Sequence, residues 1–287
     1  MDWIRGLQRA IDYMEENLTE DLDFAVIAEQ AYSSSFHFQR TFTLLTDMTV
    51  GEYIRNRRLS LAGEEFSAND VKVIDLALKY GYDTPESFTK AFTRFHGITP
   101  SGAHQKGARL KSFNRLSITI SLKGGKVMEY QILERDSFKV LTKVKSFLHD
   151  ECGDKIPMFW SKCKEDGSLK VLCENSSQDT LLGLCEPEKK GEKSFRYGIG
   201  IECNHEITVP DGFELWTLPA NTWAVFQCVG PMPTAIQDMW KKIYSEFFPQ
   251  SEYEPIDGTD FERTPDGDTQ SNEYVSEIWI PVKKKLD

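Results

Sequence analysis

The stretch GYDTPESFTKAFTRFHGITP, residues 81–100, has a counterpart in SSSFHFQRTFTLLTDMTV, residues 33–50. Each contains two phenylalanines four residues apart, and the two pairs correspond at a constant offset: Phe38 and Phe42, Phe88 and Phe92. Residues four apart lie on one face of a helix. A short apolar segment precedes each copy, FAVIAEQA from Phe24 and VIDLALKYG from Val73. The pattern predicts two helix-turn-helix units.

The turns between the paired helices support this prediction. Gly81 supplies a backbone conformation that other residues resist, and it stands where the second turn is expected. Asp83 or Thr84 can cap the following helix, with Pro85 at its first position, where a missing N–H has no cost. In the first unit, Tyr32 occupies the place of the turn glycine.

Helical spacing divides each second helix into an apolar stripe for the core and a polar stripe for a partner. The apolar stripes are Phe38, Thr41, Phe42 and Leu45 in the first copy, and Phe88, Ala91, Phe92 and Phe95 in the second. On the outer stripe, Gln39 can pair with adenine and Arg40 with guanine or a phosphate. A generic helix pair with a solvated face explains one copy equally well, but two copies in the same internal register favour a DNA reader.

Residues 1–111 resemble the DNA-binding domain of AraC/XylS transcription activators, most closely in DLALKYGYDTPESFTKAFTRFHGITPSGAH from Asp75. The resemblance implies an all-α domain of two helix-turn-helix units bridged by a long helix, here TVGEYIRNRRLSLAGEEFS from Thr49. Arg55, Arg57 and Arg58 form the basic side of that helix. The residues expected at DNA are Phe36, Gln39, Arg40 and Thr43 in the first unit, and Thr84, Glu86, Ser87, Thr89, Lys90 and Arg94 in the second.

Charge separates the two halves of the 287-residue chain. Residues 1–128 hold 16 basic and 16 acidic side chains, whereas residues 129–287 hold 18 basic and 29 acidic ones. Residues 87–128 contain eight basic residues and no acidic one. A basic stretch followed by an acidic region indicates two tasks on one chain.

Several classes of protein are disfavoured. No apolar run approaches the roughly 18 residues that a membrane span needs, and the start has no apolar signal-peptide core. The six cysteines include no CxxC pair, which argues against a zinc knuckle. We therefore expect a cytoplasmic protein without cofactor, metal site or membrane partner, and the resemblance to AraC/XylS activators implies that it is bacterial.

The second half predicts an α+β domain. SITISL and KVMEYQILER flank KGG and indicate a hairpin, so residues 112–126 are expected to be a linker and first strand. Two strand–helix–strand–strand patterns follow, starting at FKVLTKVKSF and TWAVFQCVG, and predict an antiparallel sheet with both helices on one side. Residues 127–287 resemble the GyrI-like effector-binding domain, which has this duplicated unit.

A ligand pocket is expected in this second domain. In YVSEIWIPV, strand alternation places Glu277 on one face with Val275 and Trp279, where a buried carboxylate without a partner is costly. An edge-strand glutamate facing water is the simpler alternative. The resemblance implies that such a glutamate meets a cationic, amphipathic ligand. The other expected ligand residues are aromatic, for which core packing is the alternative: Phe159, Trp160, Tyr197, Trp223, Trp240, Tyr274 and Trp279.

The sequence thus predicts a DNA-binding transcription regulator, an activator, with a small-molecule sensing domain. The expected partners are two adjacent major grooves of double-stranded DNA, a small-molecule effector and RNA polymerase, and no enzymatic activity is expected. One alternative is a hydrolase of strained small molecules, in which Glu277 would act with Trp279 or Tyr197. Another is a degenerate pocket that serves as a protein-interaction module.

Overall fold

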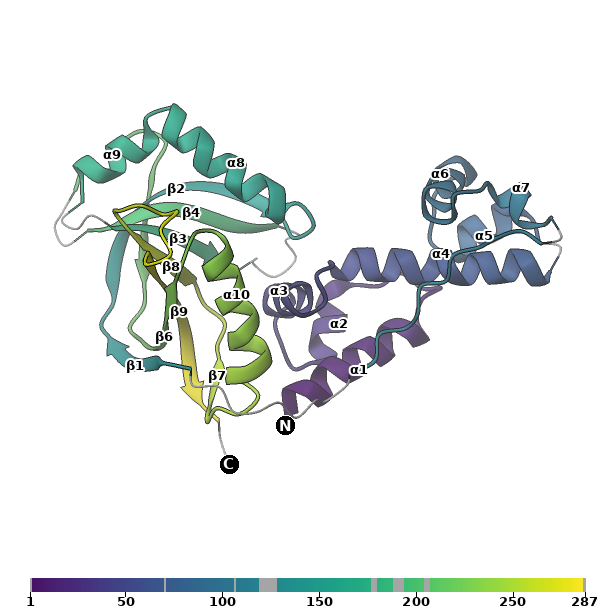
Figure 1. The fold of residues 1–287 in the computed structure, drawn as a ribbon, viewed down its shortest axis with the longest axis horizontal. Coiled ribbons are helices and arrows are strands. Elements are labelled where there is room, and N and C mark those ends of the chain that lie inside the picture. Colours follow the sequence, from purple (N-terminus) through teal and green to yellow (C-terminus); the bar gives the residue numbers. More distant parts are fainter. Residues whose placement is uncertain are drawn as a thin grey trace. The chain divides into compact units, whose positions relative to one another are not determined.

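The chain forms two units, Met1–Leu122 and Lys123–Asp287 (Figure 1). The structure is a computed structural model, and it describes residues 2–69, 71–105, 107–118, 128–176, 180–187, 194–203 and 207–285. We call the two parts the N-terminal unit and the C-terminal unit. The predicted domain boundary after residue 111 lies inside the N-terminal unit. None of the described helices is long and apolar enough to cross a bilayer.

The described part of the N-terminal unit is helical. Its helices are α1 Asp2–Glu16, α2 Phe24–Gln30, α3 Ser35–Thr46, α4 Val50–Ala68, α5 Val73–Lys79, α6 Pro85–His96 and α7 Pro100–Ala103. The first helix-turn-helix pair is α2–α3, the second is α5–α6, and α4 bridges them. This arrangement confirms the predicted all-α domain.

Side-chain caps fix where these helices begin. Ser34 Oγ accepts from the backbone N–H of His37 at the start of α3. Thr84, rather than Asp83, does the same for α6 by accepting from the N–H of Ser87. Each cap satisfies a backbone donor that the first helical turn leaves without a partner.

The described residues of the N-terminal unit include two hydrophobic clusters. Helix α4 runs through both, and its Leu61 packs against each of them. The first cluster joins α1, the first helix pair and the start of α4, including Phe38, Phe42 and Tyr53. The second joins the rest of α4, the second helix pair and α7, including Phe88 and Phe92. The phenylalanines of the repeat therefore lie in the core of their own pair, as the helical spacing predicted.

The C-terminal unit is built on an antiparallel sheet, which confirms the predicted α+β class. Its strands are β1 Tyr130–Arg135, β2 Phe138–Leu148, β3 Thr180–Glu186, β4 Ser194–Cys203, β5 Glu214–Leu218, β6 Asn221–Val229, β7 Tyr253–Pro255, β8 Asp260–Pro265 and β9 Val275–Lys284. The order is β1-β6-β9-β8-β3-β4-β2-β5, and β7 pairs with β9. The helices are α8 Cys152–Glu165, α9 Ser168–Glu174, α10 Thr234–Lys242 and the π-helix η1 Ile243–Phe247.

The predicted duplication is present as β2–α8–β3–β4 and β6–α10–β8–β9, and the two halves meet where β3 pairs with β8. Three elements were not predicted: α9, β5 and the separation of the YEPIDGTDFE segment into β7 and β8. The turn of the predicted first hairpin lies outside the described residues. Within the described part, β1 pairs with β6.

The two faces of this sheet have different coverings. Trp160 of α8 donates to Tyr197 of β4, and Trp240 of α10 donates to Glu262 of β8, so these helices lie on the same face of the sheet. We call it the helix-covered face (Figure 1). The alternate side chains of the strands form an aromatic cluster on the opposite face, which includes Trp216, Trp223, Phe261 and Trp279.

Candidate DNA interface and candidate ligand site

Two of the four residues predicted to face DNA on α3 are buried: Phe36 is 5% and Gln39 is 7% exposed, whereas Arg40 and Thr43 are half-buried. Phe36, Gln39, Arg40 and Thr43 recur at helical spacing along this helix. The guanidinium of Arg40 lies 5.9 Å from the centre of the Phe36 ring. Gln39 Nε2 donates to Ser35 Oγ at 3.0 Å, and Thr43 Oγ1 donates to the Gln39 carbonyl at 2.9 Å. The Gln39 amide is thus held by Ser35 and the Arg40 guanidinium lies near Phe36, and amide and guanidinium groups are those that pair with adenine and guanine.

The predicted residues of α6 fall into two groups. Glu86, Lys90 and Arg94 are exposed on the helix surface. Thr84 and Ser87 belong to the cap instead, since Ser87 Oγ also donates to the Thr84 carbonyl at 2.8 Å. The exposed stripe of α6 therefore carries two cations and one carboxylate, with half-buried Thr89 beside them.

Two of the three arginines on α4 are bound within the protein. Arg57 forms an ion pair with Glu15 of α1, with Nε 2.8 Å from the carboxylate. Arg58 donates to the carbonyls of Leu18 and Glu20. Arg55 is exposed. The expectation of a three-arginine basic side on this helix is therefore wrong for Arg57 and Arg58, which connect helices.

In the C-terminal unit, the helix-covered face contains an aromatic pair next to a strand glycine. Trp160 Nε1 donates to Tyr197 Oη at 2.9 Å. A Cβ atom at Gly183 of β3 would lie 2.4 Å from that hydroxyl and 3.4 Å from the Trp160 ring. Glycine at this position is therefore required for the tyrosine and tryptophan to approach the sheet.

A carboxylate lies beside this pair. Glu262 of β8 is directly opposite Gly183 in the β3–β8 register, and residues in that relation have Cβ positions about 5 Å apart. Trp240 Nε1 donates to Glu262 Oε1 at 2.7 Å, and the Trp240 ring stacks on Tyr244 at 6.1 Å. Burial, and then the nearby Glu262 charge, raise the pKa of the Cys228 thiol to about 12. Glu262, itself half-buried, thus places a carboxylate next to the buried side chains of Trp240 and Tyr244.

Glu277 has a different environment from the one expected. It lies on β9 opposite Arg263 of β8, and Arg263 Nη1 is 3.1 Å from Glu277 Oε2. Trp279 Nε1 donates to the same carboxylate at 2.8 Å, and the Arg263 guanidinium lies 5.7 Å from the Trp279 ring centre. The premise of a carboxylate without a partner is therefore wrong, because the chain supplies the counter-charge itself.

The structure divides the predicted ligand residues between the two faces. Phe159, Trp160, Tyr197 and Trp240 belong to the helix-covered face. Trp223 and Trp279 lie in the aromatic cluster on the other face, with Glu277 at its margin. Tyr274 precedes β9 and donates to the Pro265 carbonyl at 2.6 Å.

Glu262 was missed by sequence reasoning, although a signal was present. In DFERTP, alternation places Asp260 and Glu262 on one side of the strand and Phe261 and Arg263 on the other. A glycine inside a neighbouring strand, as at Gly183, marks a close approach by another group. Together they indicate a carboxylate next to a recess. Among the described residues, no group of three or more His, Cys, Asp or Glu side chains could hold a metal ion.

Comparisons with known proteins agree with the division into two units. A family model described as integron-associated effector binding protein matches residues 131–282, and one described as helix-turn-helix domain matches residues 27–106. The HTH-type transcriptional activator AarP of Providencia stuartii is 42% identical over 89 residues, which are 31% of this chain and 66% of AarP. The regulatory protein SoxS of Salmonella typhimurium is 35% identical over 95 residues, which are 33% of this chain and 89% of SoxS.

A solved structure resembles about half of the chain. It is that of SAV2435 bound to tetraphenylphosphonium, which matches with a TM-score of 0.50 at 26% identity. The match covers 54% of this chain and 94% of SAV2435. Tetraphenylphosphonium is a large aromatic monocation.

Proposed function

The chain belongs to the integron-associated effector-binding protein family and carries an AraC-type helix-turn-helix domain ahead of that region, and from this premise we propose that it activates transcription when a small molecule binds. It is a DNA-binding transcription regulator with an effector-binding unit. The observation that supports the proposal most is the presence of two capped recognition helices, α3 and α6, each with its apolar stripe in a core of its own.

On the DNA side, we propose that α3 and α6 enter adjacent major grooves about one helical turn, or roughly 34 Å, apart. Arg40 and Gln39 would read bases, while Lys90 and Arg94 would approach the second groove together with Thr89. Selection of duplexes from a random pool by the whole protein tests this proposal. Two separated motifs of conserved sequence are expected, and a single motif would contradict two-groove binding.

On the ligand side, we propose that an amphipathic monocation binds on the helix-covered face, with Glu262 as its counter-charge. Trp240, Trp160 and Tyr197 surround the carboxylate with aromatic surface. Each aromatic face attracts a cation by roughly 0.5–2 kcal/mol. The tetraphenylphosphonium bound by SAV2435 has the same chemistry. Glu277, which is ion-paired with Arg263 and lies on the opposite face of the sheet, is the matched comparison.

The experiment compares Glu262→Gln with Glu277→Gln, because both remove one charge and keep the side-chain shape. Calorimetry with tetraphenylphosphonium and with neutral triphenylphosphine oxide measures the role of the charge. Glu262→Gln should weaken the cation by one to two orders of magnitude, about 1.4 kcal/mol per order, and change the neutral probe little. Glu277→Gln should change both by less than about threefold, or roughly 0.6 kcal/mol. If instead Glu277→Gln weakens the cation and Glu262→Gln does not, Glu277 is the counter-charge of the ligand.

Activation through RNA polymerase is a further part of the proposal, supported by the name of AarP as a transcriptional activator. Transcription in a purified system, with polymerase and a template carrying a selected site, tests it. The hydrolase alternative is tested by incubating the protein with the ligand and measuring how much ligand remains. Recovery of the ligand unchanged after prolonged incubation favours a sensor, whereas its steady consumption would favour an enzyme.

A further inference from the structure

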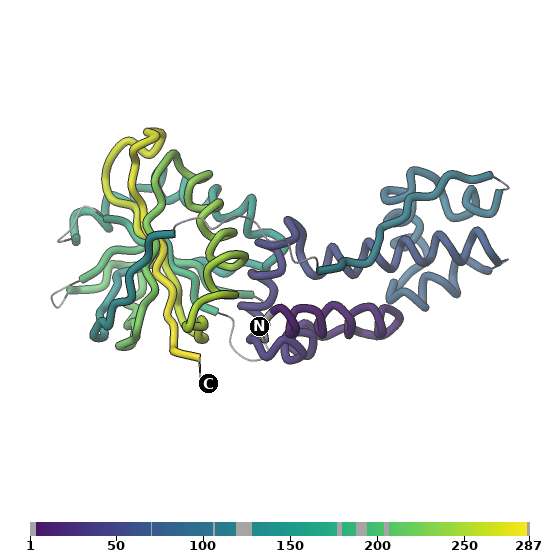
Figure 2. The backbone as a smooth tube through the Cα atoms, turned by 60° about the horizontal axis from the view of Figure 1, so that its bottom comes forward, coloured from purple at the N-terminus to yellow at the C-terminus, as the bar shows by residue number. Residues whose placement is uncertain are grey.

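The chain that follows α7 lies back along the bridging helix. Residues 107–118 have no regular secondary structure, and we call them the strap. Figures 1 and 2 both show this segment running beside α4 towards α1. Its contacts with α4 move from Ser60 to Arg57 to Tyr53 as the strap proceeds from Phe113 to Leu116. The strap is therefore antiparallel to α4.

The beginning of the strap is held by the second helix pair. Leu110 packs against the second hydrophobic cluster. The backbone N–H of Lys111 donates to His96 Nδ1 at 3.1 Å. Because Nδ1 accepts, His96 Nε2 carries the proton and donates to the Leu59 carbonyl at 2.9 Å. One imidazole at the end of α6 thus connects the strap with α4.

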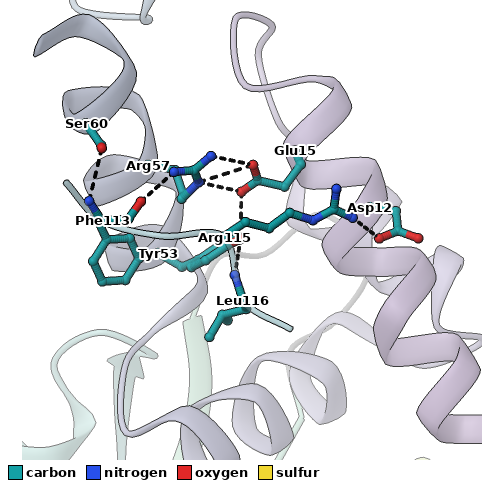
Figure 3. A network of polar contacts seen from close by, with 8 residues as sticks. All are labelled: Asp12, Glu15, Tyr53, Arg57, Ser60, Phe113, Arg115 and Leu116. Atoms are coloured by element: carbon teal, nitrogen blue, oxygen red, sulfur yellow. Dashed lines mark hydrogen bonds and ion pairs between the residues drawn. The ribbon is translucent and has the colours of Figure 1, made fainter. Parts of the chain in front are cut away.

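The end of the strap is held by the first hydrophobic cluster and by polar contacts with α4 and α1, which Figure 3 shows. Phe113, Leu116 and Ile118 pack against the first hydrophobic cluster. The Phe113 carbonyl accepts from Arg57, whose guanidinium is also paired with Glu15 of α1. Arg115 is ion-paired with Asp12, one helical turn earlier on α1.

Two deeply buried side chains of α4 accept hydrogen bonds from strap amides. Ser60 is 1% exposed, and its hydroxyl accepts from Phe113 N–H at 3.0 Å. Tyr53 is 0% exposed, and its hydroxyl accepts from Leu116 N–H at 3.2 Å while donating to Glu15 at 2.6 Å. Polar groups at such depth are costly without a partner, so α4 presents acceptors that suit a chain lying in this place.

We infer that the strap fixes the two helix pairs relative to each other, and so sets the spacing of the two DNA half-sites that the protein accepts. The inference rests on the proposed two-groove binding. The two pairs contribute to different hydrophobic clusters, which α4 joins, and a long helix is rarely straight. The strap touches both clusters and spans the part of α4 between them. Tyr53, Ser60 and His96 are thereby positioning residues for DNA recognition, although none lies on a recognition stripe.

The spacing of the half-sites provides a readout that a general loss of stability does not change. One added base pair between the half-sites rotates them by about 34–36° relative to each other. A protein with rigidly held helix pairs loses simultaneous engagement of both half-sites, whereas a loosened one retains more of it. The test uses duplexes selected by the whole wild-type protein, with and without that base pair.

The main variant is the double substitution Tyr53→Phe with Ser60→Ala, which removes both acceptors and leaves the packing nearly unchanged. Tyr80→Phe is the matched control, because Tyr80 is a buried tyrosine whose hydroxyl donates to Glu65 of α4 and not to the strap. The wild type and the control should lose at least about tenfold in affinity with the added base pair. The double variant should bind the original spacing more weakly and lose less than about threefold on insertion.

Phe113→Ala provides a second route, since it changes the strap and leaves α4 intact. The Phe113 ring packs against Tyr53 with its centre 6.0 Å away. The same relaxed spacing is expected. If both variants weaken the two duplexes by equal factors, the strap does not set the spacing and the inference is wrong. Failure of the wild type to select any duplex would overturn the proposed function, and the strap inference with it.

Discussion

Tyr32 has a backbone conformation that a residue with a large side chain rarely adopts. Its φ is 52°, in the left-handed region, and its ring is 84% exposed. Gly81 occupies the corresponding turn of the second helix pair with a φ of 74°. The Arg9 guanidinium lies 4.6 Å from the Tyr32 ring centre, a contact that offsets part of the strain.

We predict that Tyr32→Gly raises the free energy of unfolding of the N-terminal unit by about 1 kcal/mol, since left-handed backbone costs an L-residue roughly that much. Asp47→Gly is the comparison: Asp47 ends α3 with a φ of 55°, but aspartate tolerates this region better. A smaller gain is expected there. Urea unfolding followed by circular dichroism measures both. A loss of stability in Tyr32→Gly would show that the Arg9 contact outweighs the strain.

His96 makes the stability of the N-terminal unit depend on pH. Burial lowers the pKa of its imidazole, and the charge of Lys111 lowers it further, against the opposing effect of the Leu59 carbonyl. The unfolded chain, with a pKa of about 6.5, then binds the proton more readily than the folded one. The contribution of His96 is thus fully present above about pH 6.5 and is lost as the pH falls below it.

We predict that the wild type loses stability between about pH 6.5 and 5 and that His96→Gln flattens this part of the profile. Urea unfolding at a series of pH values provides the measurement. His104→Gln is the control, since His104 lies in the same unit but is exposed. Identical profiles for the wild type and His96→Gln would assign the acid sensitivity to other groups.

The neighbours of Glu277 and Glu262 in the C-terminal unit could be predicted only in part from the sequence. Strand alternation correctly grouped Glu277 with Trp279. It could not show that Arg263 lies opposite, because the β8–β9 register is set by long-range pairing. Nor could it show which face the helices cover. That arrangement gives Glu262 its aromatic neighbours, whereas Glu277 has Arg263 as its neighbour.

At the scale of elements, the cap of α6 determines how firmly the second recognition helix begins. Thr84 Oγ1 accepts from Ser87 N–H at 3.1 Å. Thr49 forms a full capping box at the start of α4, in which Glu52 also accepts from the Thr49 N–H at 2.8 Å.

We predict that Thr84→Ala lowers the free energy of unfolding by about 1 kcal/mol and Thr49→Ala by up to about 2 kcal/mol, because the second change disturbs two reciprocal bonds. Urea unfolding ranks the two variants. Thr84→Ser retains the acceptor and should behave nearly as the wild type. Equal losses for Thr84→Ala and Thr84→Ser would show that the methyl group, and not the hydroxyl, supports the helix start.

Elements with a repeating pattern were predictable from the sequence, and those without one were not. Phe88 and Phe92 recur at helical spacing, so α6 and its buried side followed directly. The long alternation of β9 was equally clear. The strap has no periodic pattern in its sequence. Its backbone N–H groups, such as those of Lys111 and Phe113, donate to side chains of α6 and α4 rather than to a repeating backbone ladder. No local pattern could therefore reveal it.

At the scale of the whole molecule, the acidic excess of residues 129–287 predicts that DNA binding belongs to the first half of the chain. A fragment of residues 1–122 should bind the selected duplexes, and a fragment of residues 127–287, which carries the acidic excess, should not. A fragment of residues 1–111 lacks most of the strap and leaves Ser60 and Tyr53 without donors. It should unfold at lower urea concentration. Gel shifts and urea titrations decide both points, and strong DNA binding by the acidic fragment would contradict the assignment.

Because α3 and α6 carry different side chains, the DNA site that the protein would bind is asymmetric. On the proposed two-groove binding, one chain presents two unlike surfaces to DNA, Gln39 with Arg40 on one helix and Lys90 with Arg94 on the other. A single chain that binds in this way differs from the symmetric dimers that read palindromes, because its two helices carry different side chains. Its site on DNA therefore has a beginning and an end. If that site is inverted beside a gene, the other recognition helix lies nearer to the start of transcription. The orientation of the site can therefore affect transcription, whereas inverting a palindrome changes nothing.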